Sequence, residues 1–554
     1  MLESKRGFLF LAFAILSFLL YQAWQKDYGP KPELTPVTSE QGLVGKSSNT
    51  DAENLITVTT DRLILKIDTL GGDLVYAETL DYDLRLNQPQ PKVVLLDYRE
   101  RTYLAKSALL GTGAPDNQLP RANYRADKTS YQLAEGQDEV IVPLRWQNAE
   151  GVSFIKTFTF KRDSYLVGLD YQINNQSNND RTFNFIAELV RDQKETGLED
   201  KGAFGMKPFL GVAYSPEGEV YEKRDYEDLM DEPIKATRQG GWIGYIQHYF
   251  VAAWIPEQDR TINLSAKASQ VAEGDFESKV QFVQPSISVP ANSQQQIKAS
   301  LYVGPKLLEQ LEAAAPGLNK TMDLSWVWWI GIPLYKLLNF FYGFLANWGL
   351  AIIMVTVVVK TLLYPLSKKQ YKSAHAMRKL QPKMQRLKER YGEDKQRMQQ
   401  EMMKMYKDEG ANPLGGCLPM LLQFPIFIAL YYVLFEAVEL RHAPFFGWIQ
   451  DLSVADPYFV LPILMGASMY LMQKMQPVSP NMDPVQQKMF QYLPVMLSVF
   501  MLFFPAGLVL YWLCNNLISI AQQQYVNKKI EHQEALGKSA LTKNKKSTKA
   551  KKKG

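Results

Sequence analysis

The sequence has few of the side chains that build disulfide frameworks or histidine-based metal sites. Its 554 residues include two cysteines, Cys417 and Cys514, and four histidines. Two cysteines in apolar stretches cannot make a disulfide framework, and four scattered histidines argue against a zinc site. The net charge of +5, from 62 Lys and Arg against 57 Asp and Glu, excludes a uniformly basic nucleic-acid binder. We therefore expect no metal and no DNA partner.

The motifs of the common enzyme classes are also missing from the sequence. There is no GxxxxGK phosphate loop, no GxSxG nucleophile elbow and no HExxH zinc motif. Each of these patterns carries a defined chemistry. We therefore expect a protein that is not an enzyme and that holds no cofactor.

The residues that are present fall into unlike stretches. Residues 25–325 are polar with strand-like alternation, whereas much of 326–524 is apolar enough for a membrane. At the N-terminus, Lys5 and Arg6 precede an apolar run that ends near Trp24. No small-x-small cleavage site follows this run, so residues 1–24 are predicted to be an uncleaved anchor with its basic end in the cytoplasm. A removed signal peptide is the alternative.

Residues 51–325 are predicted to form an antiparallel β-sandwich that ends in a short helix, after a flexible linker at 25–50 rich in Pro, Ser, Thr and Gly. Apolar and polar residues alternate at 55–59, 152–158 and 297–302, and turns are expected at 71–72, 174–175 and 216–218. This spacing is typical of a large sandwich. The leucines of 306–322 recur at helical spacing. Because this part follows an anchor with its N-terminus inside, we expect it on the outer side of the membrane.

Charge decides which of the later apolar segments cross the membrane. Residues 367–414 carry 13 Lys and Arg against 6 Asp and Glu, and residues 524–554 carry 10 Lys against 2 Glu. The positive-inside rule places both stretches in the cytoplasm. This requires residues 326–346 to be an amphipathic helix lying in the outer interface rather than a span. Six transmembrane helices are then predicted, at 8–24, 349–366, 417–438, 458–473, 489–505 and 507–523.

The rest of the domain plan follows from these spans, with both termini in the cytoplasm. It consists of transmembrane helix 2 in 347–366, a cytoplasmic helical hairpin at 367–414, transmembrane helices 3–6 in 415–523 and a basic cytoplasmic tail at 524–554. We expect this Lys-rich tail to be disordered. It could contact anionic lipid or the phosphates of ribosomal RNA, or only enforce the topology, and the residues leave both open.

Lys360 is the most informative residue of the apolar half. A charged side chain within a span costs about 2.5–3.5 kcal/mol on insertion scales, and such residues usually face a wet cavity or a partner. The alternative is snorkelling, because Lys360 lies on the cytoplasmic side of its span, where a long side chain reaches the headgroups. Thr356, Gln423, Asn515 and Asn516 are further polar residues within spans. With Lys360 they could line a hydrated groove, or they could form hydrogen bonds between packed helices.

Methionines at helical spacing mark the predicted hairpin. Those singled out are Met377, Met384, Met398, Met402 and Met405. Methionine is flexible and suits promiscuous apolar recognition. The alternative is that these side chains only hold the two antiparallel helices of the hairpin together.

Several short motifs occur in an order that resembles a known family. They are 302–306 (YVGPK), 347–349 (NWG), 364–366 (YPL), 380–383 (LQPK), 412–417 (NPLGGC), 431–432 (YY) and 504–511 (FPAGLVLY), with Pro419, Gln423 and Pro425. From the anchor to the basic tail, the sequence resembles the Gram-negative YidC membrane protein insertases. The resemblance implies a multi-span α-helical protein of the inner membrane with six transmembrane helices, a periplasmic β-supersandwich domain and a cytoplasmic helical hairpin.

The resemblance also implies a function, which is to insert and fold inner-membrane proteins without catalysis or nucleotide. In this family, one cation in a hydrophilic groove attracts acidic residues of the incoming client. Lys360 stands at that position, which is commonly arginine, Thr356 matches a groove position, and Trp512 stands where a tyrosine is often found. The implied partners are nascent inner-membrane proteins, which the hairpin methionines could contact, the Sec translocon (SecYEG, SecDF), the ribosome at the basic tail, and membrane lipids.

Two functions of other classes stay open from the residues alone. A solute transporter would need paired ionisable residues at mid-bilayer and an inverted repeat, and the sequence shows neither. A membrane-tethered periplasmic sugar-processing enzyme could use a sandwich of this size. It would need converging carboxylates or a histidine in a pocket, and His248 is the only histidine of this part.

Overall fold

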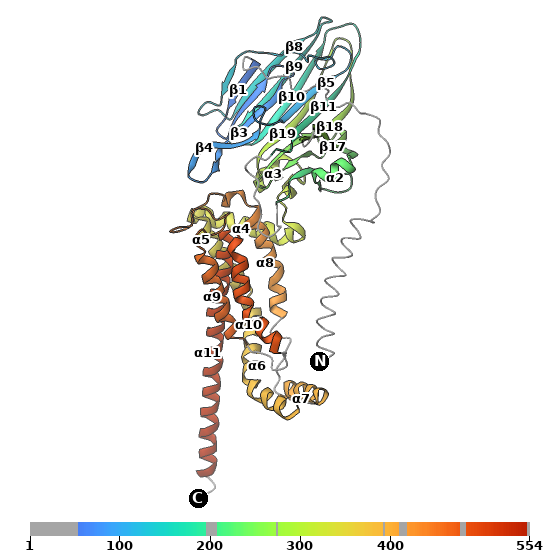
Figure 1. The fold of residues 1–554 in the computed structure, drawn as a ribbon. Coiled ribbons are helices and arrows are strands. Elements are labelled where there is room, and N and C mark those ends of the chain that lie inside the picture. The colour runs from blue at the N-terminus through green and yellow to red at the C-terminus, as the bar shows by residue number, and fades with distance from the viewer. Residues whose placement is uncertain are drawn as a thin grey trace. The chain divides into compact units, whose positions relative to one another are not determined.

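The computed structural model describes residues 54–194, 208–272, 275–391, 394–408, 418–476 and 484–550. These residues divide into a β-rich unit, within 54–323 and at 436–438, and a helical unit, within 324–435 and 439–550. Figure 1 labels several strands of the first unit and the helices of the second. The predicted anchor at 1–24 with its span at 8–24, and the predicted linker at 25–50, lie outside the described residues.

Two large sheets form the β-rich unit. Within the described ranges, one sheet has ten strands in the order β14-β17-β18-β11-β5-β3-β2-β1-β7, with β4 beside β3. Its strands are β1 (Leu55–Thr59), β2 (Leu63–Asp68), β3 (Asp73–Arg85), β4 (Gln88–Leu96), β5 (Tyr103–Leu110), β7 (Ser130–Gln132), β11 (Arg181–Asp192), β14 (Ile234–Gln239), β17 (Thr261–Ala272) and β18 (Asp275–Val289).

The second sheet has nine strands in the part of the chain that is described, in the order β13-β12-β15-β16-β19-β10-β9-β8-β6. Its strands are β6 (Arg125–Ala126), β8 (Glu139–Gln147), β9 (Val152–Lys161), β10 (Leu166–Asn175), β12 (Gly211–Tyr214), β13 (Glu222–Arg224), β15 (Ile243–Ile246), β16 (Phe250–Pro256) and β19 (Ser293–Pro305). The unit also contains the short helices α2 (Tyr226–Asp231) and α3 (Leu308–Ala314).

The two sheets share one hydrophobic core. β9 and β10 bury every second residue over most of their length, as an alternating strand with one buried face does. Phe154 of β9 meets Phe183 of β11 with ring centroids 5.4 Å apart, and Tyr171 of β10 meets Phe185 of β11 at 5.5 Å. Each pair joins one sheet to the other. The prediction of a large domain of packed antiparallel strands is therefore confirmed.

Most of the predicted strands and turns have their counterparts in this unit. The alternating segments 55–59, 152–158 and 297–302 lie in β1, β9 and β19. Gly71 and Gly72 form a turn with φ of +77° and +65°, a region that glycine adopts without a steric penalty. The turn predicted at 216–218 contains Gly218 with a φ of +78°.

The turn predicted at Asn174 and Asn175 is wrong. Both residues end β10, where they pair with Ser153 and Val152 of β9. The Asn175 amide is buried and donates to the carbonyl of Asn179 at 2.9 Å, and it also reaches two carbonyls near the end of β18. The polar side chain that suggested a turn therefore closes the end of the strand instead.

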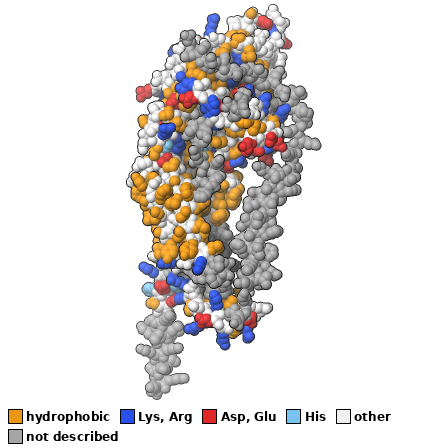
Figure 2. Space-filling model, in the orientation of Figure 1, with side chains coloured by type: hydrophobic (Ala, Val, Ile, Leu, Met, Phe, Trp, Pro, Cys, Tyr) orange, Lys and Arg blue, Asp and Glu red, His pale blue; other side chains and the backbone are white. Residues whose placement is uncertain are grey.

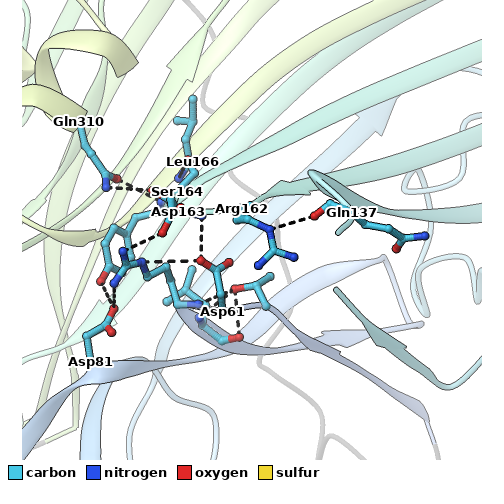
Figure 3. Close-up of polar contacts among 12 residues, drawn as sticks. Asp61, Asp81, Gln137, Arg162, Asp163, Ser164, Leu166 and Gln310 are labelled. Atoms are coloured by element: carbon cyan, nitrogen blue, oxygen red, sulfur yellow. Dashed lines mark hydrogen bonds and ion pairs between the residues drawn. The ribbon is translucent and has the colours of Figure 1, made fainter. Parts of the chain in front are cut away.

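A polar cluster fastens the loop between β9 and β10 (Figure 3). The Arg62 guanidinium donates to Asp81 at 3.0 Å and to Asp163 at 2.8 Å, and Asp61 accepts from the backbone N–H of Asp163 at 2.9 Å. Gln310 of α3 donates to the carbonyl of Asp163 at 3.1 Å. These residues come from distant parts of the sequence, so the cluster ties α3 to the sandwich.

The helices of the helical unit occur in the predicted order. They are α4 (Trp328–Leu345), α5 (Trp348–Leu362), α6 (Tyr364–Tyr391), α7 (Lys395–Asp408), α8 (Leu418–Glu436), α9 (Val460–Lys474), α10 (Pro484–Phe500) and α11 (Ala506–Ala550). α4 lies in the segment predicted as interfacial. The boundary predicted between the span at 349–366 and the hairpin at 367–414 is wrong, because α5 ends at Leu362 and α6 begins at Tyr364 after a bend of 68°. The rest of α6, with α7, lies in the predicted hairpin. α11 packs against α5, α6 and α9, and α10 packs against α9 (Figure 1).

The basic tail is helical rather than disordered as far as it is described. α11 continues from the apolar segment to Ala550. Residues 524–550 contain no proline and one glycine, Gly537, and Lys, Gln, Glu and Ala are good helix formers. A helix that packing has already ordered also extends without a new nucleation cost. The expectation of disorder is therefore wrong up to Ala550.

Apolar side chains cover much of the outer surface of the helical unit. Phe340, Leu362, Ile463, Val495 and Met496 are each more than half exposed, and Figure 2 shows orange hydrophobic side chains gathered over these helices. Among the described residues, no single helix is long and apolar enough to cross a membrane. α5 and α6 together are long and apolar enough, and they meet at a bend of 68°. The count of six spans therefore stays a prediction.

Candidate functional site

Lys360 lies in the last turn of α5, inside the helical unit. The helix begins after Asn347, whose side chain accepts a hydrogen bond from the Leu350 N–H at 3.0 Å and caps the first turn. The helix ends at Leu362, and α6 leaves at an angle of 68°. Lys360 is only 3% exposed. Its side chain is therefore enclosed by neighbouring helices. The snorkelling alternative requires the amine to reach the surface of the unit, and it does not.

The Lys360 amine joins three helices through neutral acceptors. Nζ donates to Oγ of Ser519 on α11 at 2.8 Å and to Oε1 of Gln423 on α8 at 3.4 Å. Gln423 in turn donates from Nε2 to Oδ1 of Asn515 on α11 at 2.8 Å. No ion pair formed by the described residues includes Lys360. The structure thus brings together three predicted site residues, Lys360, Gln423 and Asn515.

The other three predicted residues of this site lie around that cluster rather than in it. Thr356 is buried one helical turn before Lys360, and its hydroxyl donates to the carbonyl of Ile352 at 2.7 Å. Asn516 turns toward α9, where it donates to Oγ of Ser468 at 3.1 Å. Trp512 is half-buried and meets Phe427 of α8 edge to face, with ring centroids 4.7 Å apart. Of the six predicted residues, Lys360, Gln423 and Asn515 thus form one hydrogen-bonded group, and the other three lie beside it.

Sequence reasoning missed Ser519 and Gln522, which both contact Lys360. Gln522 donates from Nε2 to the carbonyl of Lys360 at 3.3 Å. The missed signal is spacing, because Asn515, Ser519 and Gln522 recur at i, i+4 and i+7. Residues at this spacing share one face of a helix. A search of the span for polar residues at helical spacing would have found them.

The hairpin methionines mostly pack inside the hairpin. Met384 of α6 and Met402 of α7 are buried with Leu380 and Tyr406 in a small core, and Met377 and Met405 pack against it. Met398 is half-buried outside this core, and Met403 is 61% exposed. The alternative that these side chains hold the two helices together therefore describes Met377, Met384, Met402 and Met405.

The arrangement around Lys360 suits the binding of an anion. A lysine ammonium has three N–H donors, and its contact with Gln423 is long for a hydrogen bond. A carboxylate could therefore take one donor while the contact with Ser519 persists. Among the described residues, no group of three or more His, Cys, Asp and Glu side chains is placed to hold a metal ion.

Two family models match the chain and together cover most of it. The model described as "YidC periplasmic domain" matches residues 55–337, and the model described as "60Kd inner membrane protein" matches residues 340–534. The first match covers nearly all of the β-rich unit and the start of α4, and the second covers most of the rest of the helical unit.

Curated relatives are similar over nearly the whole length. "Membrane protein insertase YidC" of Haemophilus influenzae (strain PittEE) is 46% identical over 544 residues, which is 96% of this chain and 98% of the relative. The protein of the same name from Pasteurella multocida (strain Pm70) has the same identity and coverage. A crystal structure described as an active YidC insertase is 18% identical, with a TM-score of 0.36 over 85% of this chain and 92% of that one.

Proposed function

The chain belongs to the YidC family of membrane protein insertases, and we propose that it inserts its clients by drawing an acidic tail toward Lys360. The identity to relatives of that name extends over 96% of the chain. This supports insertion of inner-membrane proteins, and it supports neither a solute transporter nor a sugar-processing enzyme. The observation that carries the proposed mechanism is the enclosed Lys360 amine with neutral acceptors.

The physical argument concerns the cost of moving a carboxylate out of water. Desolvation of such a charge costs several kcal/mol. Two opposite charges 4 Å apart attract by about 4 kcal/mol at an effective dielectric constant of 20. A cation that is already held inside the helical unit therefore offsets much of the cost for the client tail. The membrane potential adds about 2.3 kcal/mol per charge per 100 mV.

The client's apolar segment supplies the remaining driving force. Its transfer into lipid is favourable by about 25 cal/mol per Å² of apolar surface removed from water. The exposed apolar side chains of the helical unit give that segment a lipid-like surface along which to leave. In this mechanism Lys360, Thr356, Gln423, Trp512, Asn515 and Asn516 line the hydrophilic groove that the tail enters.

The proposed topology has six spans, both termini in the cytoplasm and the β-rich unit in the periplasm. The distribution of Lys and Arg at 367–414 and 524–554 supports it. In the proposed interfacial helix and just before it, Trp326, Trp328 and Trp329 are all more than half exposed, and tryptophan favours the membrane interface.

The proposed contacts of the basic tail follow from the same topology, and the proposed work with the Sec translocon rests on membership of the family. The basic end of α11 would meet the ribosome or anionic lipid headgroups on the cytoplasmic side. The insertase would act alone or with the Sec translocon (SecYEG, SecDF), and it would also assist folding as a chaperone. In the hairpin, the half-buried Met398 and the exposed Met403 are the methionines best placed for a client.

The role of the Lys360 charge can be tested with two clients that differ only in the acidic residues of their tails. Lys360→Ala should slow the insertion of a client with an acidic translocated tail by about 30-fold or more, because loss of one partner of a desolvated charge pair costs about 2–5 kcal/mol. Lys360→Arg, which keeps the charge, should insert the same client at the wild-type rate. The measurement is protease protection of the client in vesicles reconstituted with each variant.

Two controls separate the charge effect from general damage. The same client with its acidic residues changed to amides should insert equally with the wild type and Lys360→Ala. Lys488→Ala, which removes an exposed lysine on α10, should leave both clients unaffected. Equal insertion of the acidic client by the wild type and Lys360→Ala would contradict the proposal.

A further inference from the structure

α11 presents a polar stripe to Lys360 within the span predicted at 507–523. The stripe consists of Asn515, Ser519 and Gln522, at i, i+4 and i+7, and it contacts α5 and α8. Asn516 and Gln523 lie on a neighbouring face and donate to Ser468 and to the Met475 carbonyl on the α9 side. The two sets of polar side chains therefore have different partners, and only the first reaches Lys360.

Gln522 holds the backbone of Lys360. The last carbonyls of a helix have no N–H donor from their own helix, and α5 ends two residues after Lys360, before the 68° bend into α6. The Gln522 side chain donates to the Lys360 carbonyl at 3.3 Å. This contact fixes the end of α5 against α11 at the residue that carries the charge.

Ser519 holds the amine of the same residue. Its side chain is buried, and its hydroxyl donates to the Asn515 carbonyl at 2.7 Å. Because that bond uses the only proton of the hydroxyl, Oγ can act only as an acceptor toward Lys360. The distance from Lys360 Nζ is 2.8 Å, shorter than the 3.4 Å to Gln423. Ser519 is thus the nearer of the two acceptors, and its orientation is set by its own helix.

We propose that Ser519 is a positioning residue that keeps the Lys360 ammonium inside the helical unit, where an acidic client tail can reach it. The proposal rests on the proposed function of Lys360. Lysine has a flexible four-carbon stem and can move its charge to the headgroup region. The contact with Ser519 opposes that movement, while the longer contact with Gln423 is the one that a client carboxylate replaces.

The test combines Ser519 and Lys360 variants in one cycle. Ser519→Ala should lower the insertion rate of the acidic-tail client about tenfold to a hundredfold, the effect of losing one hydrogen bond to a charged group. Ser519→Thr, which keeps the hydroxyl, should restore the rate. In the Lys360→Ala background, Ser519→Ala should have no further effect. Ser498→Ala, which removes a hydroxyl that donates to the Pro462 carbonyl on another helix pair, is the matched control.

Each outcome of this cycle has a distinct meaning. A loss confined to the acidic client, and absent without Lys360, supports the positioning role. An equal loss for the acidic and the amide client, or a further loss in the Lys360→Ala background, shows a purely structural role and overturns the proposal. A normal rate for Ser519→Ala beside a slow Lys360→Ala also overturns it but leaves the proposed function intact. A normal rate for Lys360→Ala overturns the proposed function itself.

Discussion

Lys156 in the sandwich core should make the stability of the β-rich unit depend on pH. Its side chain is fully buried on β9, and Nζ donates to the carbonyls of Gly71 at 2.9 Å and Ser107 at 3.3 Å. The rings of Tyr124 and Tyr171 lie 6.0 Å and 5.2 Å from the amine. Burial, followed by repulsion from a neighbouring arginine, lowers the pKa of Lys156 from 10.5 to about 7.

The sign follows from proton binding in the two states. In the unfolded chain the pKa of Lys156 returns to 10.5, so between pH 7 and 10.5 the unfolded state binds more protons than the folded state. The free energy of unfolding therefore rises with pH across this window and falls as the pH drops toward 7. One proton contributes about 1.36 kcal/mol per pH unit. Between pH 7 and 9 the expected change is about 2 kcal/mol, because the folded group is half protonated at the lower limit.

Lys156→Met isolates this contribution with little change in side-chain volume. The two carbonyls keep a donor, because Arg121 Nη2 donates to Gly71 at 3.1 Å and to Ser107 at 2.7 Å. At pH 7 the variant should have a higher urea midpoint and a larger free energy of unfolding than the wild type. The difference between the two free energies of unfolding should be about 2 kcal/mol smaller at pH 9. The assay is pulse proteolysis of the full-length protein in urea, following the protected β-rich fragment. A difference in the free energy of unfolding that does not change with pH, or a variant less stable than the wild type at pH 7, would refute the reasoning.

Two further predictions concern the stability of the β-rich unit and of the hairpin. Arg121→Met should destabilise the β-rich unit by about 3–5 kcal/mol. Arg121 pairs with the buried Asp73 at 2.6 Å and Asp116 at 2.7 Å, and both carboxylates would lose this cation. An unchanged urea midpoint would contradict the prediction. Met402→Ala should lower amide protection in α6 and α7 by about 2–5 kcal/mol, whereas Met403→Ala, at an exposed position, should not. Hydrogen exchange compares the two variants, and equal effects would show that Met402 does not hold the hairpin.

Much of the fold could be predicted because one face of most elements is buried. The alternation at 152–158 survives as β9, since a strand in a packed sheet must place every second residue inward. The strand order could not be read in the same way. β11 lies between β18 and β5, and β19 lies between β16 and β10, so neighbours in space are far apart in sequence. The same topology assembles Lys156, Arg121 and Asp73 from separate segments.

The candidate site could be predicted in part, because a charge in an apolar helix is conspicuous. Lys360 is found by its charge alone, and Gln423 and Asn515 by their polarity. Ser519 escaped notice because a lone serine is common in apolar helices, and its importance comes from the 2.8 Å contact with Lys360. The hairpin methionines show the opposite case, since a helical spacing that suits recognition also suits a core, and only packing distinguishes the two.

Site-directed crosslinking to an arrested client tests the central claim most directly. A photoreactive group at position 512, on α11 beside α8, should crosslink to the acidic residues of a stalled client tail, and the crosslink should be lost with Lys360→Ala. The same group at position 517, which is exposed on α11, should not crosslink to those residues. A crosslink from position 512 that persists without the lysine, or equal crosslinks from both positions, would contradict the account.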